Sequence, residues 1–136
     1  MKASLLLLLA ACSAVLSSYV LAQPAYPPRP VRLLVGFAPG GTTDIIARLM
    51  APALSEFFDQ QFYVDNRPGA TGNIATELAA KSVPDGCTLL VVSAAFSSNI
   101  SVYPRAGYDP LRDFAPITRV AAVYNVLVVH PSVPVK

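Results

Sequence analysis

Histidine, cysteine and charged residues are scarce in this sequence, and each scarcity narrows the functions that it can carry. The 136 residues include one histidine, two cysteines and only 13% charged residues. His130 precedes a proline at the end of an apolar run, where a structural histidine is commoner than a general base. No group of His, Cys and carboxylate residues has the spacing of metal ligands. We therefore expect a protein that uses no metal and no cofactor.

Positive charge is too small and too scattered to indicate a nucleic-acid partner. The formal net charge is +2, and one of these charges is Lys2 in the N-terminal apolar segment. Lys and Arg form no run and do not interleave with aromatic residues. We therefore expect no binding to nucleic acid.

Familiar catalytic motifs are also missing. The sequence has no Gly-x-Ser-x-Gly elbow, as a hydrolase of the α/β class would have. Its Gly40-Gly41 pair fits neither Gly-x-Gly-x-x-Gly nor a phosphate-binding P-loop, since no lysine follows the glycines. The sequence therefore argues against a small α/β enzyme. We keep such an enzyme only as an alternative function.

The N-terminal segment has the features of a secretory signal peptide. Lys2 supplies a positive start, Ala3–Leu21 is almost wholly apolar, and Val20-Leu21-Ala22 fits a cleavage site after Ala22. We expect residues 1–22 to be removed and the protein to be periplasmic. Two alternatives stay open: a retained membrane anchor, since about 19 apolar residues can span a bilayer, and a lipoprotein anchored at Cys12. Without Cys12, Cys87 has no partner for an intramolecular disulfide.

The stretch Val31–Asp44 predicts a strand, a tight turn and the start of a helix. Val31–Phe37 is apolar, Pro39-Gly40-Gly41 is a turn, and a helix is expected from Thr43 to Phe58. Its core face is predicted by the helical spacing of Ile45, Leu49, Pro52/Ala53 and Phe57. Glycines let the backbone approach a ligand closely, and the free N–H groups of a helix start favour an anion. An ordinary connection between a strand and a helix is the alternative interpretation.

Two further strands are predicted to end in polar loops. Phe62–Asp65 leads into Asn66–Asn73 and a helix over Ile74–Ser82, and Thr88–Val92 leads into Ser93–Asn99. The last strand candidates are Ile117–Ala121 and Val126–Val129. We predict an α/β fold with a mostly parallel sheet. Because the carboxyl ends of parallel strands share one edge, the three loops should converge on one crevice.

A small carboxylate needs several donors, because micromolar affinity requires about 8 kcal/mol and each charge-assisted hydrogen bond contributes roughly 1.5–3 kcal/mol. Backbone N–H groups, hydroxyls and the Asn73 amide of the three loops are the candidates. Asp44 would repel an anion, so we expect it, Thr42 or Thr43 to cap the first helix, and Thr71 or Asn73 to cap the second. The candidate ligand-binding residues are Pro39, Gly40, Gly41, Thr42, Thr43, Gly69, Ala70, Thr71, Gly72, Asn73, Ser93, Ser97 and Ser98.

Six motifs in this order resemble a known family. They cover nearly all of the chain after residue 22 and are Tyr26–Pro30, Phe37–Asp44, Asn66–Asn73, Pro84–Gly86, Tyr108–Pro116 and Val128–Pro131. Each motif alone is weak, but the ordered set is specific. The chain resembles the substrate-binding proteins of tripartite tricarboxylate transporters, also called the Bug receptor family.

This resemblance implies a type II periplasmic-binding-protein fold, in which two α/β lobes close on a small carboxylate that a membrane permease then takes up. The chain would hold an incomplete first lobe. The expected division is a signal peptide over 1–22, a proline-rich extended leader over 23–30, partial lobe 1 over 31–125 and the start of a crossover to a second lobe over 126–136. A truncated family remnant that binds nothing is the remaining alternative.

Overall fold

The computed structural model describes residues 25–103, 106–124 and 128–134. The predicted signal peptide and Cys12 lie outside the described residues, and residues 25–30 of the proline-rich leader contain neither helix nor strand. No helix among the described residues is both long enough and apolar enough to cross a membrane. The elements in chain order are β1 (Val31–Val35), α2 (Thr42–Phe58), β2 (Phe62–Asn66), the 3₁₀ turn η1 (Ala70–Gly72), α3 (Asn73–Ala80), β3 (Thr88–Val91) and α4 (Ala95–Val102).

The three strands form one parallel sheet in the order β2-β1-β3. Val31 pairs with Phe62 on one side of β1, and Arg32 pairs with Thr88 on the other. The central strand is the most buried, which explains its near-continuous apolar sequence. The predicted α/β fold with a parallel sheet is confirmed.

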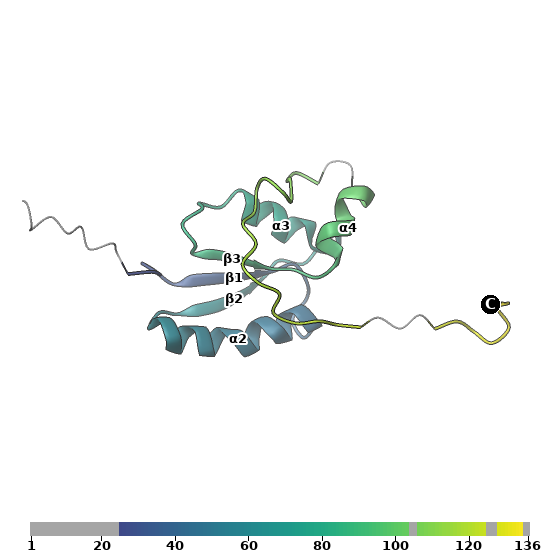
Figure 1. Ribbon diagram of the computed structural model, residues 1–136, viewed down its shortest axis with the longest axis horizontal. Helices are drawn as coiled ribbons and strands as arrows, with labels where there is room; N and C mark the ends of the chain where they lie inside the picture. The colour runs from purple at the N-terminus through teal and green to yellow at the C-terminus, as the bar shows by residue number, and fades with distance from the viewer. Residues whose placement is uncertain (1–24, 104–105, 125–127, 135–136) are drawn as a thin grey trace, which may run out of the picture.

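Helices α2 and α3 lie on opposite sides of the sheet (Figure 1). The chain moves from β1 to β2 in one direction and then past β1 to β3 in the other, and parallel crossovers are right-handed. A right-handed connection in each direction places the two helices on opposite faces. On the α2 side, the core consists of Val31, Leu33, Ala51 and Phe62, with Leu54, Phe58, Val64, Leu89 and Val91 packed against it.

The buried face of α2 differs from the predicted one. Ile45, Leu49 and Phe57 are 50%, 73% and 81% exposed, whereas Ala47 and Ala51 are buried. The small alanines let the helix axis approach the sheet closely, and large side chains at these positions would hold it away. The prediction followed the larger apolar residues and was therefore wrong about the face.

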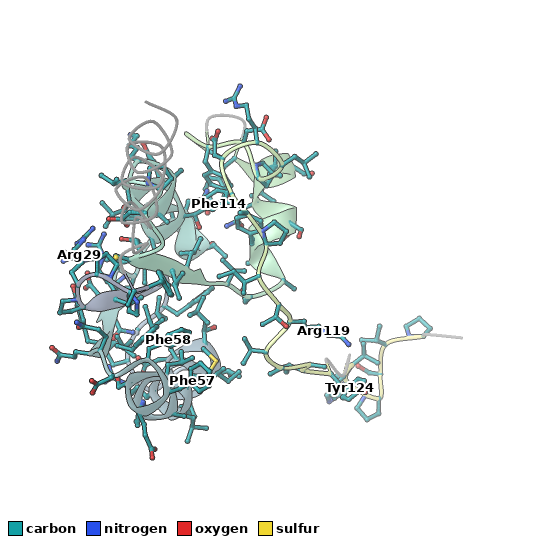
Figure 2. The ribbon with its side chains drawn as sticks, turned by 60° about the vertical axis from the view of Figure 1, so that its left-hand side comes forward. Arg29, Phe57, Phe58, Phe114, Arg119 and Tyr124 are labelled. Carbon is teal, nitrogen blue, oxygen red and sulfur yellow. The ribbon has the colours of Figure 1, made fainter. Side chains whose placement is uncertain are left out.

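Two segments after β3 also differ from prediction. Ser93–Asn99 was expected as a loop, but helix α4 begins at Ala95. Ile117–Ala121 contains no strand, and neither do residues 128–129, while residues 126–127 lie outside the described part. A strand needs a neighbour to hydrogen-bond with, and this segment runs away from the sheet, carrying Arg119 and Tyr124 with it (Figures 1 and 2).

Candidate functional site

Four polar side chains are buried among the described residues, and all four follow carboxyl ends of the strands. Asp44, Asn73, Thr76 and Asn99 are 1%, 7%, 4% and 3% exposed. They come from α2, α3 and α4, which start after β1, β2 and β3 respectively. Buried polar groups are costly unless they are hydrogen-bonded, so their gathering at one edge of the sheet marks this edge as the candidate site.

A small hollow lies at this edge, and all three loops contribute to it. Its volume is about 10 Å³, roughly the space of one water molecule. It lies where the connections from β1 and β3 depart to opposite faces, the position at which open α/β sheets bind ligands. The lining residues carry no charge and are Gly36, Phe37, Thr71, Gly72, Thr76, Leu90, Val91, Val92, Ser93, Phe96 and Asn99.

Close contact between two backbones closes the floor of the hollow. A Cβ on Gly36 would lie 2.7 Å from Cα of Gly72, too close for any side chain. Gly72 itself has φ +91°, a conformation that favours glycine. The close approach of the two loops therefore requires glycine at position 36, while the backbone conformation favours glycine at position 72.

The loop after β1 is held by the buried carboxylate of Asp44. Its Oδ2 accepts hydrogen bonds from the Gly40 N–H at 2.8 Å and from Nε of Arg48 at 2.9 Å. Its Oδ1 accepts from Nδ2 of Asn66 at 2.8 Å, and the same nitrogen donates to the Phe37 carbonyl at 3.1 Å. The Arg48 guanidinium, the Gly40 N–H and the Asn66 amide together lower the pKa of Asp44 to about 2. Both carboxylate oxygens are thus occupied within the protein.

The predicted helix caps do not form. Gly41 is the N-cap of α2 and Gly72 that of α3, and neither helix start has a side-chain cap bond. Asp44 lies in the first turn of α2 and reaches back to the Gly40 N–H, so it holds the loop that precedes the helix. The N–H of Gly40, which we predicted as a ligand donor, is bonded to Asp44.

The second and third loops are joined by a network of neutral groups around Asn73. Nδ2 of Asn99 donates to the Thr71 carbonyl at 2.9 Å and to Oδ1 of Asn73 at 2.8 Å. The Tyr108 hydroxyl donates to the same Oδ1 at 3.0 Å. Phe96 stacks on the Tyr108 ring with centroids 5.8 Å apart. The network therefore ties residues from three separate segments to one amide.

The predicted site residues divide into two groups. Thr71, Gly72 and Ser93 line the hollow, and Asn73 adjoins it through Asn99. The others surround the edge without lining the hollow: Pro39, Gly40, Gly41, Thr42 and Thr43 in the first loop and the start of α2, Gly69 and Ala70 in the second loop, and Ser97 and Ser98 on the exposed side of α4.

Several residues of the edge were not chosen from the sequence. Asn99 belonged to the predicted polar segment. If that segment had been predicted as a helix, the helical spacing would have placed Asn99 on a different face from the exposed Ser97 and Ser98. Tyr108 comes from a distant irregular segment, and no local pattern indicates its contact with Asn73. The remaining lining residues were not chosen either, and they are Gly36, Phe37, Thr76, Leu90, Val91, Val92 and Phe96.

Two properties limit the chemistry of this part of the chain. The described residues contain no group of three or more His, Cys, Asp or Glu side chains that could hold a metal ion. Cys87 is a free, buried cysteine at the opposite end of β3. The residues that line the hollow are all uncharged.

Comparison with known proteins identifies relatives along most of the chain. A family model described as "Tripartite tricarboxylate transporter family receptor" matches residues 46–136. Protein BugT of Bordetella pertussis is 42% identical over 109 residues, which cover 79% of this chain and 33% of BugT. A protein from a tcbD-tcbE intergenic region of Pseudomonas sp. is 43% identical over 105 residues, or 77% of this chain and 31% of that one. The chain thus spans about a third of the length of these relatives.

Solved structures agree with this similarity. The periplasmic binding protein BugD has a TM-score of 0.65 and 41% identity, covering 68% of this chain and 31% of BugD. MatC of Rhodopseudomonas palustris, solved with bound malate, has a TM-score of 0.59 and 34% identity over 67% of this chain and 31% of MatC. Rpa4515 of R. palustris, solved with adipate, has a TM-score of 0.60 and 46% identity over 63% of this chain and 29% of that protein. The chain belongs to the tripartite tricarboxylate transporter receptor family.

Proposed function

We propose that this chain belongs to a periplasmic receptor that binds a small dicarboxylate or tricarboxylate at the carboxyl edge of its sheet. The observation that carries this proposal is the gathering of all four buried polar side chains of the described residues at that edge, around an uncharged hollow. Two relatives support it, since MatC was solved with malate and Rpa4515 with adipate, both dicarboxylates. Receptor function, rather than an enzyme, is the expectation that follows.

The proposed recognition uses neutral donors held in place in advance. Hydrogen bonds from N–H and O–H groups to a carboxylate are charge-assisted, and each contributes roughly 1.5–3 kcal/mol. Micromolar affinity requires about 8 kcal/mol, so several donors from different loops must act together. We propose that they come from the loop segments 39–43, 69–73 and 93–98, with Asn73 as the central side-chain donor. Asp44 takes no part in ligand contact because its oxygens already bind protein donors.

The rest of the functional proposal follows from the family. We propose export by the segment 1–22, with a Cys12-anchored lipoprotein as the alternative, a first lobe over 31–125, and a crossover beginning near 126. A membrane permease of the tripartite type is the proposed partner. The intact mass of the protein recovered from the periplasm separates the two export routes. A chain beginning at Gln23 supports cleavage after Ala22, whereas acyl mass on Cys12 supports the lipoprotein.

Calorimetry on the protein as its organism produces it tests the ligand class. We expect malate or adipate to bind with micromolar affinity and adipamide, the uncharged diamide of adipate, to bind at least tenfold more weakly. The diamide keeps the length and shape of adipate while removing its negative charge. Equal affinity for adipate and adipamide, or no binding of either dicarboxylate, would contradict the proposal.

A further inference from the structure

The carboxamide of Asn73 has only one side left for a ligand. Its Oδ1 accepts two hydrogen bonds, from Nδ2 of Asn99 at 2.8 Å and from the Tyr108 hydroxyl at 3.0 Å. A carbonyl oxygen has two lone pairs, so both are used. Among the described residues, no hydrogen bond is found to Nδ2 of Asn73, and no buried side-chain nitrogen lacks a partner. Among the described residues, Nδ2 therefore has no acceptor, and it is the side of the amide that a ligand could meet.

The orientation of this amide follows from a backbone carbonyl. The Thr71 carbonyl can only accept, so the group of Asn99 that faces it at 2.9 Å must be the NH₂. That NH₂ also faces Asn73, so the Asn73 atom opposite it must be the oxygen. Turning Asn73 over would set two donors against each other at positions 7% and 3% exposed, where an unpaired donor is costly.

Tyr108 is compatible with the same orientation, because its hydroxyl can donate to Oδ1 of Asn73. Phe96 stacks on the Tyr108 ring, and Phe114 packs edge-on against both with centroids 5.4 and 5.9 Å away. The hydroxyl is therefore held in place by packing rather than by the hydrogen bond alone.

We propose that Asn99 and Tyr108 are positioning residues that leave Asn73 with only N–H donors for a ligand. Asn73 then favours an acceptor, such as a carboxylate oxygen, and disfavours a ligand group that donates. This inference rests on the proposed function for the identity of the ligand, but the orientation of the amide does not depend on it. It also gives the third loop a role through Asn99, beside the donors proposed for 93–98.

A double-mutant cycle tests the proposal on the protein as its organism produces it. We expect Tyr108→Phe to weaken malate or adipate binding by about threefold to tenfold, the loss expected for a neutral hydrogen bond. In the Asn73→Ala background, the same substitution should have no further effect, because Tyr108 acts only through Asn73. Tyr63→Phe, at a half-exposed position on β2, is the matched control and should change nothing. An equal loss in both backgrounds would overturn the positioning role.

A ligand-free measurement separates this inference from the proposed function. In a ¹⁵N–¹H spectrum, the side-chain amide of Asn73 should give one sharp pair of resonances in the wild type and a shifted or broadened pair in Tyr108→Phe. An Asn73 pair unchanged by Tyr108→Phe would overturn the inference even if dicarboxylates bind. If neither malate nor adipate binds the wild type, the proposed function fails, and this spectrum still decides whether Tyr108 holds the amide.

Discussion

The two ends of the sheet hold their polar groups in opposite ways. At the carboxyl edge, Asp44, Asn73 and Asn99 are almost fully buried, and each bonds to more than one partner. At the amino edge, Arg29, which is labelled in Figure 2, pairs with Asp85 at 2.7 Å. The two side chains are 57% and 31% exposed. Exposed ion pairs contribute little to stability, whereas buried polar groups must be satisfied or they destabilise the fold. Only the carboxyl edge therefore depends on its polar network.

The larger of the two openings lies at the amino edge, where the polar groups are exposed. A groove of about 350 Å³ lies on the amino side, far larger than the hollow of about 10 Å³ at the carboxyl edge. Its cations Arg29, Arg32 and Lys81 already lie in ion pairs with Asp85, Asp65 and Glu77. A ligand anion would have to compete with those carboxylates for the same cations. Among the described residues, the buried polar side chains therefore gather at the edge with the smaller opening.

The largest loss of stability is expected from Gly36→Ala, at the carboxyl edge. The new Cβ would lie 2.7 Å from Cα of Gly72, a backbone atom that cannot rotate away. Overpacking of this kind costs about 1–3 kcal/mol, and it would also separate the first two loops. Urea unfolding measures the loss of stability. Gly41→Ala is the control, because its φ is −73° and its nearest neighbour would lie at 3.3 Å. An equal loss in both variants would mean that the contact between the loops is unimportant.

The next effect is expected from Asp44→Ala. This change removes the acceptor for Gly40, Arg48 and Asn66, and leaves donors of the first loop without a partner. We expect the melting temperature to fall by several degrees and ligand affinity to fall with it. Asp85→Ala removes a carboxylate at the amino edge that is far more exposed, so its melting temperature should fall less. Equal shifts would show that burial does not distinguish the two edges.

Acid should remove the contribution of Asp44 over a defined range. Its pKa is about 2 in the folded protein, below the ordinary 3.8, because Arg48, Gly40 and Asn66 stabilise the charged form. A carboxyl group with a lowered pKa stabilises the fold fully above its ordinary pKa, and this stabilisation is lost as the pH falls through the folded value. The stability gap between the wild type and Asp44→Asn should therefore be constant above about pH 4 and close toward pH 2. A gap independent of pH, in urea unfolding at pH 2–6, would contradict this.

The sequence predicted the fold better than the site, for reasons that particular residues make clear. Three parallel strands and two of the three α-helices followed from local periodicity and turn chemistry, which are properties of short segments. The burial of Ala47 and Ala51 in place of Ile45 and Leu49 did not, because it depends on how closely α2 approaches the sheet. The contact of Tyr108 with Asn73 spans 35 residues and leaves no local signal. The positions of the loops along the chain could therefore be predicted, but the hydrogen bonds that their residues make could not.

The smallest effect is expected from Arg29→Ala at the amino edge. Its guanidinium lies 2.7 Å from Asp85, and this contact lowers the pKa of the Asp85 carboxyl. The pair is nevertheless exposed, so water replaces it at little cost and salt screens it. A second contact, from the Tyr26 hydroxyl to the Gly86 carbonyl at 2.9 Å, still holds the leader against the 84–86 turn. We expect the melting temperature to change less than in Gly36→Ala, Asp44→Ala or Asp85→Ala, and the difference to disappear in 1 M salt. A loss as large as that of Asp44→Ala would show that the amino edge, too, depends on its polar contacts.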